Sequence, residues 1–402
     1  MKSLVIQLAR LGDLMQTLPA IASLGARKPH ETLDLLCGGA LAAIVSLFPG
    51  IDRVLPWDAD RWRRWVGDWP SRPAAILAAG EAYLREISAS ASYDRAYNLN
   101  QHPRAILAAH LLAGMVVGPG YAGPISEDLP AWHRYLRQVA RERRPNHVHL
   151  SDIFCGMCGV RPPGVSPTLS RPAVELPSDL GCIGDGNARW IGVIVGAGDL
   201  ARCLPPLVWA QWITRLLDAD PDCRVVLIGT GGELARARAI REGLPPLLLG
   251  RLWDASGRTD LLQLASLLGR CQWVTGSDTG SLHLAAAVGT RTMGFYFARA
   301  RVHETGPYGE GHWIWQAPDY APATWPVVES VSLVLERSEE HSDVPEASLR
   351  DGWQLWKGHV DEWGASYSRA GERDSSRAER EQVWRDCMGD PQAAKAVARV
   401  AS

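Results

Sequence analysis

Residues 272–297 read QWVTGSDTGSLHLAAAVGTRTMGFYF: a short β-branched run, a polar turn, an alanine-rich run and a second apolar run. This order predicts a strand over 272–275, a helix from Gly280 and a strand over 292–297. Strand, helix and strand in succession are typical of a parallel sheet, whose ligands bind at the carboxyl ends of the strands. The turn between residues 277 and 283 is therefore the first candidate for a binding site.

The same alternation of short apolar runs and helical patterns continues toward the start of the chain. It predicts further strands over residues 4–8, 32–36, 190–195, 224–228 and 247–249. A stretch rich in proline and glycine, residues 161–185, interrupts the alternation. We therefore expect an α/β protein of two doubly wound, Rossmann-like domains that face a cleft. The expected divisions are a first domain over 1–170, a hinge over 171–187 and a second domain over 188–336.

The last part of the chain, residues 337–402, begins as a polar linker. Apolar residues then recur at steps of 4, 3, 4, 3 and 4, at Leu349, Trp353, Trp356, Val360, Trp363 and Tyr367. Such steps place all of these side chains on one side of a helix. We therefore expect a helical C-terminal extension whose apolar stripe packs against a neighbouring domain. A subunit interface and a membrane contact are the alternatives.

The overall charge is close to zero, because 42 Lys and Arg stand against 44 Asp and Glu. The chain therefore lacks the overall basic field of nucleic-acid-binding proteins, and we expect no nucleic-acid partner. Any anionic ligand must be held by a local site.

Neither export nor a membrane span is expected. Arg10 and Asp13 interrupt the N-terminal apolar run before it reaches the length of a secretory signal. Residues 105–125 carry no Asp, Glu, Lys or Arg, but their glycines and prolines indicate a buried helix, a short strand and a turn. We interpret Cys155 and Cys158 as two half-buried residues and not as a redox or zinc pair. The expectation is a cytoplasmic protein with no metal and no cofactor.

Four turns carry residues with possible chemistry. Asp13 follows the first strand, so it either caps a helix or acts as a general base. The turn 196–205, with Gly196, Ala197, Gly198 and Arg202, either binds a diphosphate or is an ordinary turn with a solvated arginine. Glu233, after a glycine-rich turn, either accepts hydrogen bonds from ribose or occupies the first turn of a helix.

The fourth turn, 277–283, is the most specific of these patterns. Asp278, Thr279, the Gly280 backbone and His283 would converge on a patch that grips phosphate and sugar hydroxyls. In the alternative interpretation, Asp278 is a helix N-cap and His283 is a buried, hydrogen-bonded side chain.

These motifs together resemble a known family. GDLMQTLP near the start, R-x-x-P at 202–205, Glu233 and DTGSLHLAAAVGT from 278 resemble the heptosyltransferases of glycosyltransferase family 9. The resemblance covers about residues 2–335. It implies a GT-B fold, an ADP-heptose donor in the second domain, an acceptor on the first domain, and inverting transfer without a metal.

The resemblance also implies roles for individual residues. Asp13 resembles the catalytic base. The implied donor-binding residues are Gly196, Ala197, Gly198, Arg202 for the diphosphate, Glu233 for ribose, Thr259, Asp278 for heptose, and Thr279, Gly280 and His283 for phosphate and sugar. The implied acceptor-binding residues are Arg10, Gly12, Arg61, Arg63, Arg64 and Arg104.

Two features bear on the acceptor. The segment 60–65, DRWRRW, resembles the loop by which heptosyltransferase I binds an anionic acceptor, although it could be a solvated helix face or enter a membrane interface. Asp58-Ala-Asp60 matches a metal-binding DxD pattern, but so short a match is easily met by chance. The departures from the family pattern are Arg202 where lysine is usual, Leu204 where tryptophan is usual, and the region beyond residue 337.

The resulting hypothesis is a glycosyltransferase that moves heptose from ADP-heptose to a hydroxyl of an anionic saccharide or glycolipid, the inner core of lipopolysaccharide. It would work in the cytoplasm, at the cytoplasmic face of the inner membrane if it contacts that membrane peripherally. One alternative is a family 9 enzyme with another donor or acceptor, in a capsule, glycoprotein or small-molecule pathway. The other is a non-catalytic GT-B scaffold that binds a partner through its tail.

Overall fold

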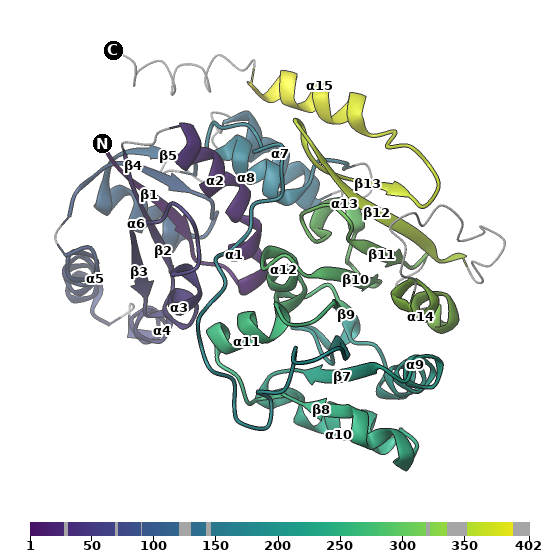
Figure 1. The fold of residues 1–402 in the computed structure, drawn as a ribbon. Helices are drawn as coiled ribbons and strands as arrows, with labels where there is room; N and C mark the ends of the chain where they lie inside the picture. The colour runs from purple at the N-terminus through teal and green to yellow at the C-terminus, as the bar shows by residue number, and fades with distance from the viewer. Residues whose placement is uncertain are drawn as a thin grey trace.

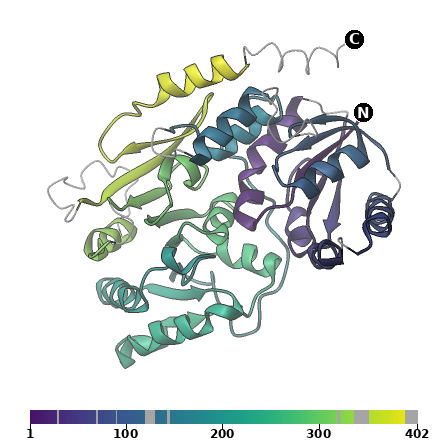
Figure 2. The same ribbon diagram turned by 180° about the vertical axis from the view of Figure 1, so that it is seen from behind.

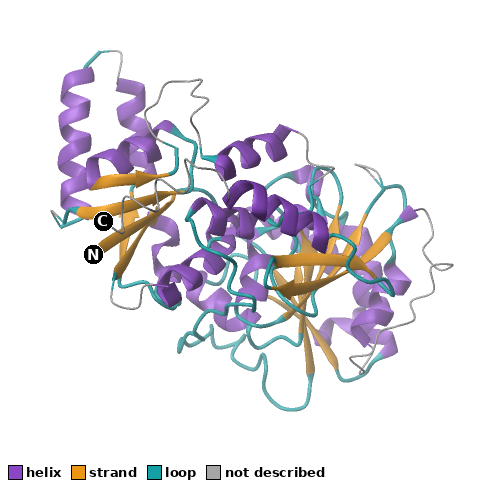
Figure 3. Cartoon of the chain, turned by 90° about the horizontal axis from the view of Figure 1, so that it is seen from above, coloured by secondary structure: helices purple, strands orange, loops and turns teal. Residues whose placement is uncertain are grey.

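The computed structural model describes residues 1–27, 31–68, 71–89, 91–119, 130–141, 146–318, 322–335 and 352–388. In these residues the chain forms one parallel and one largely parallel sheet with helices around each, and the two sheets lie side by side (Figures 1 and 3). Residues 160–188, which connect the two sheets, contain turns and bends only.

The first sheet has the strand order β3-β2-β1-β4-β5, and all of its strand pairs are parallel. Its strands are β1 (Lys2–Gln7), β2 (Thr32–Gly38), β3 (Arg53–Trp57), β4 (Tyr93–Asn98) and β5 (Ala113–Val117). The helices around it are α1 (Leu11–Gln16), α2 (Leu18–Arg27), α3 (Ala42–Val45), α4 (Ala59–Asp68), α5 (Pro73–Ile87), α6 (Pro103–Leu112), α7 (Ala131–Arg141) and α8 (Leu150–Met157). The uncharged stretch from residue 105 is helix α6 followed by strand β5, as predicted; residues 120–125 lie outside the described residues.

The second sheet has the order β13-β12-β11-β10-β9-β6-β7-β8. Its parallel strands are β6 (Arg189–Ile194), β7 (Cys223–Ile228), β8 (Leu252–Asp254), β9 (Trp273–Ser277), β10 (Arg291–Tyr296) and β11 (Trp313–Gln316). Its helices are α9 (Pro206–Ala219), α10 (Leu234–Glu242), α11 (Leu261–Leu268), α12 (Gly280–Ala287), α13 (Val302–Thr305) and α14 (Val327–Leu335). The strand predicted over 247–249 is wrong: a 3₁₀ helix spans Pro246–Arg251, because Pro246 opens that helix, and β8 follows it.

The helix predicted for the apolar stripe of the C-terminal extension is also wrong. Residues 336–351, with most of the expected linker and Leu349, lie outside the described residues. The rest of the stripe belongs to a hairpin of β12 (Gln354–Asp361) and β13 (Gly364–Arg369), which adds to β11 in antiparallel register. Three glycines at 352, 358 and 364 disfavour a helix, and Gly364 adopts a φ of 106° in the turn between the strands. The open edge of β11 offers unpaired backbone groups to the hairpin. A helix does follow, α15 (Arg377–Met388).

The extension, defined as β12, β13 and α15, joins the second sheet to the helices of the first. Figures 1 and 2 show α15 lying across α7 and α8. The Trp384 ring lies 4.3 Å from the Trp132 ring of α7, and Trp384 Nε1 donates to the carbonyl of Trp363 (3.2 Å). Trp353 and Tyr367 are each 2% exposed. The stripe therefore packs against neighbouring parts of the chain, as predicted, although as strands.

Two buried ionisable side chains anchor the extension. Asp152 of α8 accepts hydrogen bonds from the Ala365 N–H (2.8 Å) and the Tyr308 hydroxyl (3.1 Å). Arg380 of α15 donates to both carboxylate oxygens of Asp361 (2.9 Å each) and to Asp374 (2.7 Å). Asp152 and Arg380 have no exposed surface, so removing either partner of these bonds leaves a buried polar group unpaired.

Candidate active site

Asp13 lies in the first turn of α1, directly after the carboxyl end of β1. Arg10 precedes α1 with an extended backbone, and Asp13 is the third residue of the helix. The Arg10 N–H donates to Asp13 Oδ2 (3.2 Å). Asp13 is therefore not the N-cap. The other oxygen of the half-buried carboxylate, Oδ1, has no hydrogen-bond partner among the described residues and is available to accept a proton.

Two glycines bring α1 against α12. A Cβ on Gly280 would lie 2.9 Å from the Gly12 nitrogen and 2.9 Å from Leu11 Cβ, and one on Gly12 would lie 3.3 Å from His283 Cδ2. These distances are too short for side chains at Gly12 and Gly280 without a shift of their neighbours. The two sheets therefore present Asp13 and the 278–283 turn to the same region, as the expected cleft requires.

A buried ion pair organises the 278–283 turn. Arg202 Nη1 donates to Asp278 Oδ2 (2.9 Å) and to the Asp278 carbonyl (3.1 Å), while His283 Nε2 lies 3.5 Å from Asp278 Oδ1. Burial of Asp278 opposes its ionisation, but His283 and Arg202 together outweigh burial and hold its pKa below the usual value. The site thus contains an ionised carboxylate. Thr279, not Asp278, is the N-cap residue of α12.

Glu233 lies against the turn that follows strand β6. Its Oε2 accepts hydrogen bonds from the Thr230 N–H (2.6 Å) and hydroxyl (3.0 Å), and this closes the start of the helix that leads into α10. A Cβ on Gly196 would lie 1.7 Å from Glu233 Oε1, so a side chain at Gly196 would displace the Glu233 carboxylate. Glu233 therefore occupies the first turn of a helix, and it also lies beside the turn of residues 196–198.

Two other turns, residues 196–203 and 256–260, lie beside the segment 229–233. The Ala197 N–H contacts Cys203 Sγ (3.1 Å), which holds the 196–203 turn in shape. Thr259 is half-buried before Asp260, the N-cap of α11. Its loop reaches the Gly229 turn, because the Gly257 N–H donates to the Gly229 carbonyl (2.9 Å).

The basic segment of residues 60–65 is helix α4, at the carboxyl end of β3. Trp62 is buried and stacks on Trp57, with 4.5 Å between ring centroids. Arg61 lies 4.8 Å above the Tyr83 ring, whereas Arg63 and Arg64 are exposed. The segment therefore has a solvated basic face at the same edge of the first sheet as Asp13.

The DxD match contributes to this helix. Asp58 Oδ1 accepts hydrogen bonds from the N–H groups of Asp60 (3.1 Å) and Arg61 (2.8 Å), and Arg63 pairs with Asp60 (2.6 Å). Within the described ranges, no group of three or more His, Cys, Asp or Glu residues is arranged to hold a metal ion.

Arg104 is half-buried in the first turn of α6, after β4, the neighbour of β1 in the sheet. Its Nε is buried without a hydrogen-bond partner among the described residues. It thus lies at the same edge of the first sheet as Asp13.

Sequence reasoning missed two residues that position the Asp13 loop. Asn100 Oδ1 accepts a hydrogen bond from the Leu8 N–H (2.6 Å), and its Nδ2 donates to Gln7 Oε1 (2.6 Å). Gln7 is 1% exposed at the end of β1, directly after three buried apolar residues. A polar residue in such a position was the available signal, because a buried amide requires partners.

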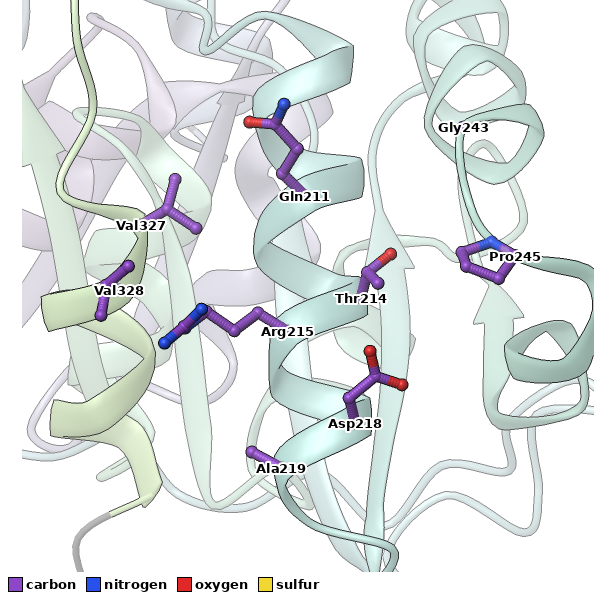
Figure 4. A pocket seen from close by; sticks show the side chains of 9 residues that line it. All are labelled: Gln211, Thr214, Arg215, Asp218, Ala219, Gly243, Pro245, Val327 and Val328. Carbon is purple, nitrogen blue, oxygen red and sulfur yellow. The ribbon is translucent and has the colours of Figure 1, made fainter.

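A groove of about 730 Å³ lies elsewhere, between α9, α14 and the end of α10 (Figure 4). Its lining includes Thr214, Arg215, Asp218 and Val328, and none of the candidate site residues. Because α9 starts at the carboxyl edge of the sheet, its last turns lie near the amino edge. The groove is therefore separate from the candidate active site.

The chain has relatives of known type. The family model described as glycosyltransferase family 9 (heptosyltransferase) matches residues 84–324. Lipopolysaccharide heptosyltransferase 1 of Escherichia coli K12 is 23% identical over 323 residues, which cover 79% of this chain and 94% of that protein. These matches span most of the chain.

Solved structures show the same fold. The E. coli heptosyltransferase with ADP gives a TM-score of 0.60 at 21% identity, with 83% of this chain and 99% of that chain covered. The same enzyme with ADP-2-deoxy-2-fluoro heptose gives 0.57 at 19% identity, with coverage of 84% and 100%. The expected GT-B arrangement of two Rossmann-like domains is thus confirmed. In the described part of the chain, every helix is too short or too polar to cross a membrane.

Proposed function

Since the chain belongs to glycosyltransferase family 9 and is a glycosyltransferase, we propose that it transfers heptose from ADP-heptose to a hydroxyl of an anionic saccharide, the inner core of lipopolysaccharide. The observation that carries this proposal is the close approach of the Asp13 segment to the 278–283 turn through Gly12 and Gly280. The E. coli relatives named above, a lipopolysaccharide heptosyltransferase and a heptosyltransferase with an ADP-heptose analogue, support this donor and acceptor class.

The proposed reaction is a single displacement. Asp13 takes the proton of the acceptor hydroxyl, whose oxygen attacks the anomeric carbon of heptose. The bond from that carbon to the phosphate oxygen breaks, and ADP leaves with the electron pair. Attack from the face opposite ADP inverts the anomeric configuration. The free Oδ1 of Asp13 is suited to this role, since Oδ2 is already engaged by the Arg10 N–H.

Charge on the leaving group would be stabilised by protein groups. Arg202, with the backbone of Thr279 and Gly280 at the start of α12, offers a guanidinium and free N–H groups to the diphosphate. We propose that these groups do the work that a metal does in other glycosyltransferases. Asp278, ionised and fixed by Arg202, would accept hydrogen bonds from heptose hydroxyls.

The proposed roles of the ribose-binding and acceptor-binding residues follow from where these residues lie in the fold. Gly196 lies against Glu233, whose Oε1 would accept from ribose, and Gly198 and Thr259 lie in the neighbouring turns. The acceptor would lie along the carboxyl edge of the first sheet, near Gly12, Arg104 and the basic face of α4. The exposed Arg63 and Arg64 suit an anionic glycolipid, and an acceptor of that kind would bring the enzyme to the cytoplasmic face of the inner membrane.

Calorimetric titration without added metal tests the donor. We expect ADP-heptose to bind in preference to ADP-glucose and UDP-GlcNAc, and Asp278→Asn to weaken ADP-heptose binding more than ADP binding. The asparagine retains the shape of Asp278 but loses its charge. Preferential binding of a uridine nucleotide would overturn the proposed donor and favour a family 9 enzyme of another pathway.

A further inference from the structure

Arg10 reaches across the site from the first sheet. Its main chain is held, because its N–H bonds Asp13 Oδ2 and its carbonyl accepts from the Leu14 N–H (3.0 Å). Its side chain is exposed and forms no ion pair or side-chain hydrogen bond among the described residues. The guanidinium is therefore free to bind a ligand.

Two guanidinium groups face one point on the opposite side of the site. A Cβ on Gly198 would lie 3.8 Å from Arg10 Nη1 and 3.9 Å from Arg202 Nη2. Arg10 follows β1 of the first sheet, whereas Arg202 follows β6 of the second. Because Gly198 has no side chain, no Cβ stands at the point that both groups approach.

The carboxylates near this point have hydrogen-bond partners of their own. Asp278 is engaged by Arg202 Nη1 and by His283, which leaves Arg202 Nη2 directed at Gly198. Asp199 is the other nearby carboxylate, and its Oδ1 accepts from the Ala201 N–H (3.0 Å). Asp13 is turned toward the Arg10 backbone. Two like charges facing one gap repel each other unless an anion lies between them.

We propose that Arg10 binds the diphosphate of the donor together with Arg202, and so does not belong to the acceptor site expected for it from the sequence. This inference rests on the proposed function, because it takes a nucleotide-activated sugar as the substrate. Arginine suits the role, since its planar fork can bond two phosphate oxygens at once. The leaving group would then be held by one cation from each sheet.

Arg10 would also contribute to catalysis. Charge grows on the diphosphate as the sugar–phosphate bond breaks, and a cation fixed at that position stabilises the transition state more than the bound donor. Arg10 is next to the segment that carries Asp13. Binding of the diphosphate by Arg10 would thus help to set Asp13 beside the anomeric carbon.

Titration of the full chain with ADP and with adenosine tests the proposal without any acceptor. Arg10→Gln should weaken ADP binding about 10- to 100-fold, the range expected for a charged hydrogen bond, and leave adenosine binding unchanged. Arg10→Lys should recover part of the loss. Arg238→Gln, which removes an exposed arginine of α10, is the matched control and should bind ADP like the unaltered chain. Thermal unfolding checks that each variant is folded.

The outcomes separate the two proposals. ADP affinity unchanged in Arg10→Gln overturns the role of Arg10 and leaves the proposed function intact. If the unaltered chain binds UDP and not ADP, the proposed donor fails, and the role of Arg10 is then decided by the same variants with UDP. If it binds neither nucleotide, both proposals fail.

Discussion

The two halves of the molecule meet at two junctions of opposite character. At the candidate active site, α1 and α12 touch through Gly12 and Gly280, while the nearby Asp13 and Arg10 side chains retain unused polar groups. At the extension, Asp152 and Arg380 are buried and their polar atoms are bonded within the protein. One junction leaves its polar groups to ligands, and the other uses them to hold the chain together. Substitutions at the first should alter activity, and substitutions at the second should alter stability.

The largest effect is expected at Asp13. Asp13→Asn retains an oxygen for the Arg10 N–H but cannot take a proton, so turnover should fall about 10²- to 10⁴-fold. ADP affinity from calorimetry and the free energy of unfolding should stay close to those of the unaltered chain. Full activity in this variant would reduce Asp13 to a residue of the first helical turn.

At the extension, Arg380→Met should lower the free energy of unfolding by up to about 3–5 kcal/mol, because it removes a fully buried cation and leaves the half-buried carboxylates of Asp361 and Asp374 without their bonds to it. Urea unfolding measures this. Arg377→Met is the matched control: Arg377 also pairs with Asp361, but its side chain is 50% exposed, and the cost should stay below about 1 kcal/mol. Equal losses in both variants would mean that burial is not what makes Arg380 important.

A smaller effect is expected from the ionisation of Asp152. Burial raises the pKa of Asp152 to about 8, whereas the same group in the unfolded chain has a pKa near 3.8. The folded state therefore binds the proton more tightly, and this contribution to stability is complete below about pH 4 and declines as the pH rises toward 8. The slope is at most about 1.4 kcal/mol per pH unit.

Asp152→Asn isolates this effect. An asparagine can accept from the Ala365 N–H and donate to the Tyr308 hydroxyl, so both contacts survive without a charge. The free energy of unfolding of the original chain, relative to that of Asp152→Asn, should decrease between pH 4 and 8. A difference that is constant with pH would show that Asp152 does not titrate in this range.

Part of the second sheet and its helices could be predicted from the local sequence pattern alone. Residues 272–297 form β9, α12 and β10 as predicted, because β-branched and alanine-rich runs separated by a polar turn favour one local conformation each. The positions of Asp13, Arg202 and Asp278 at strand ends followed from the same alternation. Where the local signal was ambiguous, as at residues 247–249 and in the tryptophan stripe, the predicted elements were wrong.

The sequence by itself determined the family, the alternating α/β units and most candidate site residues, since these depend on residues close together in the chain. Only the tertiary structure decided that the stripe becomes a hairpin, because the edge of β11 is built from residues distant in sequence. It alone placed the guanidinium of Arg10 beside that of Arg202. Distances between groups almost 200 residues apart depend on how the two sheets pack, which no local pattern records.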